Sequence, residues 1–208
     1  MNPLWIWIGA RVLYGVFELW YGNWSGPLSR KEIDDYMARI EAGSENLEPE
    51  RRATVRRFLE ADNGGEFFMA NLVRFPSEPV TDPKTGEPRP AAQVLRGYTD
   101  RFMPALLRRA GHPVFVGRAA GGYVEHWGVE PDPGWSMVGV IRYRSRRDMI
   151  ELATAPAFAP AHAFKIAAMS HTLAFPLAPG FSVLGPRVWL ALLLGLLAAL
   201  GQLSLGGA

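Results

Sequence analysis

Hydrophobic residues run without a break near the C-terminal end of the chain. The run 188–205 (VWLALLLGLLAALGQLSL) carries no charge, and Gln202 is its one strongly polar side chain. As a helix it extends about 27 Å at about 1.5 Å per residue, close to the hydrocarbon thickness of a bilayer. A core helix of a soluble domain would show a polar face every three or four positions. The pattern therefore predicts a transmembrane helix over residues 186–208.

A second apolar segment, residues 4–21 (LWIWIGARVLYGVFELWY), is framed by aromatic residues. Trp5 and Trp20 lie about 22 Å apart along a helix, which suits an aromatic belt at the two surfaces of a bilayer. Arg11 and Glu18 are seven positions apart and fall on one helical stripe, so they either pair with each other or face another helix. Residues 1–24 are therefore interpreted as a second membrane helix; an interfacial helix and an uncleaved signal anchor are the alternatives.

Basic residues near these segments predict an orientation. Arg30 and Lys31 follow the first segment, and Arg187 directly precedes the second. Positive residues favour the cytoplasmic side, so we expect an integral protein of the inner or plasma membrane with a cytoplasmic middle domain.

Small residues recur every four positions in the second segment, at Ala191, Gly195 and Ala199. Such a stripe lets another helix approach closely. We expect it to pack against the same helix of a second subunit or against the Arg11-bearing helix of the same chain.

Polar residues return at residues 25–65, which are predicted to form a helical linker. Ser29 and Glu32 match a capping box, and the helix they begin is expected to end at Gly43. A second helix is expected from Glu48-Pro49 to about Ala61. Both helices are charged on one side, so we expect them to pack on the domain or to connect it to the membrane.

Residues 66–178 alternate between strand and helix patterns. Helices are expected over 91–110 and from 145 to about 169, with breaks at Pro156 and Pro160. The Pro-rich segment 76–90 is predicted to be a loop. Strands are expected over 66–75, 113–118, near 122–127, 136–143 and 170–177. The order β-α-β-β-α-β predicts an α+β fold with the ferredoxin-like arrangement.

Composition removes several classes of function. The 208 residues carry a formal net charge of only +2, and the basic pairs are interleaved with acids, so nucleic acid is not expected as a partner. The chain has no cysteine, which excludes disulfides, thiolate catalysis and zinc–thiolate sites.

Four short motifs, in order, resemble an uncharacterised branch, a domain of unknown function, of the dimeric α/β-barrel superfamily. They are MANLVRFP at 69–76, RGYTDRFMPALLRRAGHPVFVGRA at 96–119, WSMVGVIRYRSRRDMIELATAPAF at 135–158 and AAMSHTLAF at 167–175. The resemblance implies ferredoxin-like units whose sheets pack face to face in a homodimer, with a cavity in each unit. Relatives include antibiotic-biosynthesis-type monooxygenases, muconolactone-isomerase-like enzymes and haem-binding members. A shared fold does not imply a shared reaction, so the resemblance predicts no activity.

Histidines are the main candidates for chemistry, at positions 112, 126, 162 and 171. Of these, His126 is the one expected to face a ligand, and His162 lies three residues from Lys165 on a predicted helix. No metalloprotease, two-histidine-carboxylate or nucleophile-elbow motif is present, so no metal is predicted. No cofactor is predicted either, although a haem held by a single histidine stays open.

Asn71 is a polar residue on an apolar strand face, shared with Phe67, Met69, Val73 and Phe75. This mixture suits a pocket for a flat apolar ligand with one hydrogen-bonding group, and a structural asparagine explains it equally well. The expected ligand-binding residues are Asn71, Tyr98, Tyr123, His126 and Trp127.

Two functions fit these patterns. The first is a noncatalytic membrane-anchored dimerisation or accessory module; the second is a cofactor-independent monooxygenase-like or isomerase-like enzyme acting on a hydrophobic molecule. The strand face of Met137, Gly139, Ile141 and Tyr143 lacks charge, so we expect a partner subunit of a homodimer or larger assembly to cover it.

Overall fold

The computed structural model describes residues 4–43, 48–180 and 185–206. Its contacts divide the chain into two compact units. One unit is formed by the two ends of the chain, Met1–Trp24 and Pro179–Ala208. The other is the middle, Ser25–Ala178, and it includes the segment 25–65 together with the sheet.

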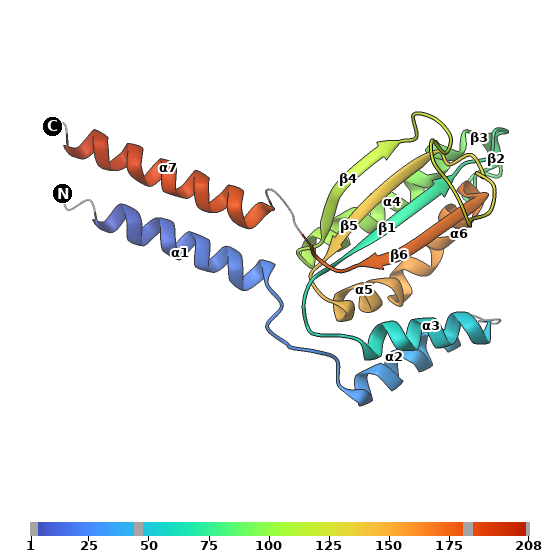
Figure 1. Ribbon diagram of the computed structural model, residues 1–208, viewed down its shortest axis with the longest axis horizontal. Coiled ribbons are helices and arrows are strands. Elements are labelled where there is room, and N and C mark those ends of the chain that lie inside the picture. Colours follow the sequence, from blue (N-terminus) through green and yellow to red (C-terminus); the bar gives the residue numbers. More distant parts are fainter. Residues whose placement is uncertain (1–3, 44–47, 181–184, 207–208) are drawn as a thin grey trace. The chain divides into compact units, whose positions relative to one another are not determined.

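The unit formed by the chain ends is an antiparallel pair of helices, α1 (Leu4–Tyr21) and α7 (Pro186–Gly206). Trp7 Nε1 donates to Gln202 Oε1 at 2.8 Å, and Arg187 contacts Glu18 near the opposite end of the pair. The start of α1 and the end of α7 thus lie at the same end of the helix pair (Figure 1).

The expectation of two membrane-spanning helices is corrected by the structure. Among the described residues, only Pro186–Leu205 in α7 is a helix long and apolar enough to cross a membrane. Helix α1 falls short because Arg11, Glu18 and its several Trp and Tyr residues lower its hydropathy.

A four-stranded antiparallel sheet forms the centre of the middle unit. Its strands are β1 (Phe67–Arg74), β4 (His112–Arg118), β5 (Met137–Tyr143) and β6 (His171–Leu177), in the order β4-β5-β1-β6. Helix α4 (Ala91–Arg108) connects β1 to β4. Helix α5 (Arg146–Ala153), a 3₁₀ turn (Pro156–Phe158) and α6 (Ala159–Ala168) connect β5 to β6. The α+β class and the predicted β-α-β-β-α-β order are confirmed.

Helices α4, α5 and α6 cover one face of this sheet (Figure 1). Phe67 and Tyr143, which are paired across β1 and β5, stack at 5.4 Å in the main core. Leu106 from α4, Leu152 from α5 and Ala161 from α6 complete that core. Every second residue of each strand therefore points toward the helices.

The same alternation corrects the expectation for the face of Met137, Gly139, Ile141 and Tyr143. Met137, Ile141 and Tyr143 pack against the core clusters formed with the chain's own helices, so no partner subunit is needed there. The face left without helices is the opposite one, which carries Phe68, Ala70 and Leu72 at its centre and Arg74 and Arg142 toward the strand ends. The sequence alternation separates the two faces but does not tell which of them the helices take.

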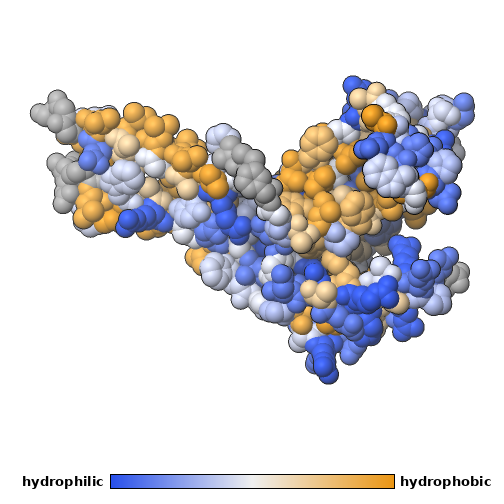
Figure 2. All heavy atoms as spheres, in the orientation of Figure 1, coloured by the Kyte–Doolittle hydropathy of each residue, from blue (hydrophilic) through white to orange (hydrophobic). Residues whose placement is uncertain are grey.

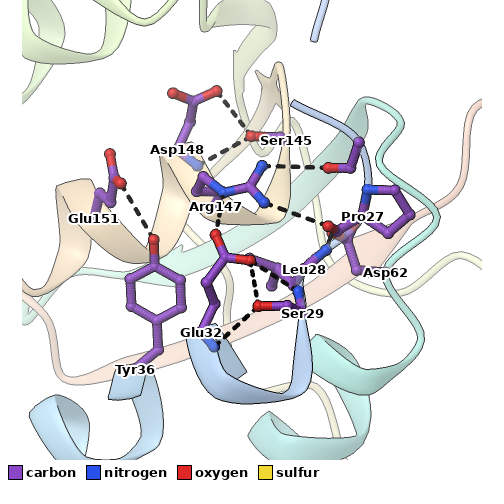
Figure 3. A network of polar contacts seen from close by, with 11 residues as sticks. Pro27, Leu28, Ser29, Glu32, Tyr36, Asp62, Ser145, Arg147, Asp148 and Glu151 are labelled. Carbon is purple, nitrogen blue, oxygen red and sulfur yellow. Dashed lines mark hydrogen bonds and ion pairs between the residues drawn. The ribbon is translucent and has the colours of Figure 1, made fainter. Parts of the chain in front are cut away.

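Helices α2 (Arg30–Ala42) and α3 (Pro49–Glu60) pack on α5. Tyr36, Met37 and Leu59 form a cluster with Ile150. The predicted capping box is present, since Ser29 and Glu32 exchange hydrogen bonds. Glu32 also accepts from Arg147 Nε at 2.9 Å, which joins α2 to α5 (Figure 3).

Two local predictions, one of a loop and one of a strand, are wrong. Segment 76–90 contains a small hairpin, β2 (Val80–Thr81) with β3 (Pro88–Arg89), turned by Asp82, whose carboxylate accepts from Lys84 N at 2.8 Å. The strand expected near 122–127 is a loop. Asp132 holds this loop by accepting from Tyr123 N and Gly134 N, so side-chain bonds replace a strand ladder.

Candidate functional site

A cavity of about 610 Å³ lies in the middle unit, on the helix-covered side of the sheet. Its walls come from α2, α3, α5 and α6 and from the β1 and β6 strands. The apolar part of the lining includes Ile40, Val55, Phe58, Met69, Met149 and Ile150. This volume falls within the range of about 300–1000 Å³ typical of small-molecule sites.

Polar groups in the lining are mostly basic. Arg39 comes from α2, Arg51 from α3 and His162 from α6, and two threonines, Thr54 and Thr154, add hydroxyl groups. None of the described lining residues is acidic. The cavity thus combines apolar walls with positive charge.

His162 connects the cavity to a cluster of titratable side chains. The His162 ring stacks on the Tyr98 ring at 6.0 Å, and Lys165 Nζ lies 5.6 Å from the centre of the same tyrosine ring. Burial raises the pKa of Tyr98 to about 12 and lowers that of His162, with a further lowering by the charge of Lys165. At neutral pH the tyrosine is therefore a neutral hydrogen-bonding group and the imidazole is uncharged.

The pKa of Lys165 is shifted as well. Burial lowers the pKa of Lys165, and the nearby charge of Arg51 lowers it further. Two cationic side chains from α3 and α6 thus repel each other beside the cavity.

Asn71 lies on the same strand face as Phe67 and Met69, which is the face that the helices cover. Its Nδ2 donates to Met69 O at 2.9 Å and to Gly139 O at 3.3 Å. These are bonds to the backbone of β1 and β5, as a structural asparagine makes. Met69, two residues earlier, contributes to the cavity lining, whereas Asn71 is not among the described lining residues.

The five expected ligand-binding residues fall into two groups. Asn71 and Tyr98 belong to the helix side of the sheet, whereas Tyr123, His126 and Trp127 lie on the exposed loop between β4 and β5. In that loop the rings of Tyr123 and His126 are 5.8 Å apart, and Trp127 is 76% exposed. Within the described part of the chain, no contact joins the two groups.

The sequence does not identify Arg39 and Arg51 as cavity residues, because residues 25–65 are predicted only to form a helical linker. The two arginines belong to the charged faces of its two helices. Such faces are usually solvated, so only packing of α2 and α3 beside α6 identifies these two residues.

Only some of the residues expected to mediate packing between the membrane helices contact the other helix of the pair. Glu18 pairs with Arg187, while Arg11 is exposed and has no ion pair within the described residues. On α7, Ala198 is buried, and a Cβ added at Gly201 would contact Ile6 at 3.4 Å. A Cβ added at Gly195 would meet nothing within 4 Å, so this central residue of the stripe Ala191, Gly195 and Ala199 does not mediate a close approach to α1.

Metal-binding geometry is absent from the part of the chain that the structure describes, where no three His, Asp or Glu residues converge. His112 Nδ1 lies 3.0 Å from Pro113 O at the start of β4, and the His171 ring contacts Ser170.

The sheet surface without helices, here called the open sheet face, is apolar over its centre. Phe115 is 58% exposed, Leu173 49% and Phe175 41%. The pairing registers place on this face the apolar residues Phe68, Ala70, Leu72, Phe115, Val138, Val140, Leu173, Phe175 and Leu177, and near the strand ends the polar residues Arg74, His112, Arg142 and His171. Figure 2 shows hydrophobic residues gathered over these strands.

Comparisons with known proteins support the fold alone. No protein-family model and no curated protein matches the sequence. A crystal structure of RPA0582, a protein of unknown function from Rhodopseudomonas palustris, is similar at 22% identity with a TM-score of 0.52, over 66% of this chain and 97% of that one. The structure of methylated RPA0582 gives 24% identity and a TM-score of 0.50, over 69% and 97% of the two chains.

Proposed function

We propose that this protein is a membrane-anchored homodimeric accessory module in which each copy holds a small hydrophobic molecule. The open sheet face carries this proposal. In the ferredoxin-like units of dimeric α/β barrels, which the sequence motifs resemble, two sheets pack face to face, and the open sheet face has the apolar surface that such packing needs.

Energetics support a second copy as the cover of this face. Burying a large apolar side chain contributes about 1.5–3 kcal/mol. Phe115, Leu173 and Phe175 are each at least two-fifths exposed, and a two-fold axis would bury every one of them twice. Contiguous exposed apolar surface of this kind usually marks an interaction site.

Helix α7 is the proposed anchor. Its length and apolar composition support a membrane span, and α1 would accompany it through the contacts at Trp7 and Glu18. Arg30, Lys31 and Arg187 then favour the cytoplasmic side for the middle unit.

A cofactor-independent enzyme is the second candidate. His162 favours it, since a neutral imidazole on the cavity wall can accept a proton from a bound molecule. Tyr98 does not supply a base, because its raised pKa keeps it protonated.

The oligomeric mass of the full chain in detergent tests the dimer. We expect a dimer by light scattering, and we expect Phe115→Glu and Phe175→Glu to convert it to a monomer because each places a charge in the interface. Ile166→Glu is the matched control, since Ile166 is 76% exposed on α6 and lies outside the open sheet face. A monomeric wild-type protein, or an equal effect of Ile166→Glu, contradicts the proposal.

Membrane attachment has its own test. The full chain should remain in the membrane pellet after an alkaline carbonate wash, and removal of residues 186–208 should release it. Release of the full chain by carbonate alone argues against an integral anchor.

A further inference from the structure

We infer that the cavity binds an acidic amphiphile, with the apolar body against Phe58, Met69 and Met149 and the anionic group between Arg39 and Arg51. This inference rests on the ligand-binding part of the proposed function and gives it a chemical class. The anionic group is a carboxylate or a phosphate, carried either by a free fatty acid or by a phospholipid.

The apolar and the basic lining residues lie in different parts of the cavity, as the two ends of such a ligand require. Phe58, Met69 and Met149 are partly buried and pack against the domain core. Arg39 and Arg51 are exposed at the ends of α2 and α3, so they border the cavity where it meets solvent. An apolar body would thus lie inside while its charged group stays at the mouth.

Ion pairing on α3 distinguishes Arg51 from its neighbours. Arg52 pairs with Glu41 at 2.7 Å and Arg56 with Asp34 at 2.9 Å. Neither Arg39 nor Arg51 has a carboxylate partner within residues 4–43, 48–180 and 185–206, although Arg39 lies over the Tyr36 ring. Among the described residues, the guanidinium groups at the cavity therefore have no competing carboxylate, and guanidinium groups bind carboxylate and phosphate through paired hydrogen bonds.

The basic groups around Arg51 add to this preference. Lys165 is close enough to Arg51 for mutual repulsion, and His162 lies one turn before Lys165 on α6. A ligand anion placed among them relieves that repulsion, whereas a neutral or cationic ligand does not.

Binding of tritiated palmitate to the full chain in phosphatidylcholine nanodiscs tests this inference, with empty nanodiscs as the baseline and methyl palmitate as the matched neutral probe. We expect saturable palmitate binding about tenfold tighter than that of the ester, as one charge-assisted interaction provides. Arg51→Gln should weaken palmitate binding by about the same factor and leave the ester unchanged.

Two further variants make the result specific. Arg57→Gln, on the same helix but outside the described lining, should leave binding unchanged. Ala159→Trp should block both probes, because Ala159 is an exposed lining residue whose enlargement fills the cavity without altering the core.

Nanodiscs that contain phosphatidylglycerol show whether the anionic group belongs to a free fatty acid or to a phospholipid. Displacement of palmitate from the wild-type chain identifies a phospholipid as the ligand, and its retention identifies a free fatty acid; either result supports an acidic amphiphile. Equal affinity for acid and ester, no saturable binding, or equal losses in Arg51→Gln and Arg57→Gln overturns the inference. Failure of the dimer proposal is seen separately, in the oligomeric mass.

Discussion

Arg187 Nε lies 3.1 Å from each carboxylate oxygen of Glu18, so a single charged pair joins the start of α7 to the end of α1. The Arg187 guanidinium also lies 4.8 Å from the centre of the Tyr21 ring. Together with the Trp7–Gln202 bond near the other end, this pair defines the register of the two antiparallel helices.

Removing either charge should loosen the helix pair. In Glu18→Gln, Arg187→Gln and the double variant, the two side chains should couple by about 0.6–1.7 kcal/mol, the range found for polar contacts between membrane helices. Unfolding in mixed micelles, followed by tryptophan fluorescence, measures this coupling. Strictly additive effects would show that the pair contributes no interaction energy.

Arg142 is a buried guanidinium on β5, only 2% exposed, that pairs with Glu66 and donates to Ala110 O. Arg142→Met should lower the free energy of unfolding by about 3 kcal/mol, because Glu66 and the Ala110 carbonyl lose their partner. Arg89→Met is the control, since Arg89 is itself exposed and its pairs among the described residues are long, 3.8 Å to Asp82 and 3.7 Å to Glu87. Denaturant unfolding compares the two variants, and equal losses would refute the special role of Arg142.

Gly97 permits the close packing of α4 on α6. A Cβ at this position would lie 2.3 Å from Phe164 Cδ1, so Gly97→Ala should destabilise the protein by about 1–3 kcal/mol as the ring is forced to move. At Gly139 an added Cβ would meet nothing within 4 Å, so Gly139→Ala should be tolerated. Thermal unfolding of both variants checks this difference.

Glu32 makes the attachment of α2 to α5 sensitive to acid. The hydrogen bond from Arg147, with those from Ser29, lowers the pKa of Glu32 from 4.5 to about 2. Its stabilising effect is therefore present above about pH 4.5 and lost as the pH falls toward 2. Glu32→Gln should melt at a lower temperature than wild type at pH 7, and the gap should shrink on acidification. A gap independent of pH would exclude the ion pair as its cause.

Local signals in the sequence predicted much of the fold. Ser29 and Glu32 define a helix start within four residues, and Pro156 and Pro160 break the helical segment where α5 gives way to the 3₁₀ turn and α6. These outcomes depend on neighbouring residues alone. The strand predicted near 122–127 is a loop because Asp132, nine residues from Tyr123, binds its backbone, and a local strand pattern does not include that contact.

The cavity could not be predicted from the sequence, because it forms only when segments far apart in the chain pack together. Arg51, Met69 and His162 lie far apart in the chain and meet only because α3 and α6 approach the same strands. Glu18 shows the same limit, since spacing left open whether it pairs with Arg11 or faces another helix, and its partner is Arg187 of α7. Long-range partners of this kind cannot be selected by spacing.

The contacts of the helix pair also impose an order on biosynthesis. Glu18 leaves the ribosome long before Arg187, and at about 5–20 residues per second the delay is roughly ten to thirty seconds. The middle unit is synthesised within that interval, and at its end Glu18 on the nascent α1 is still without Arg187. Helix α7 is therefore the element that finishes assembly, and ribosomes stalled before residue 186 should display a chain whose first helix lacks both of its polar links.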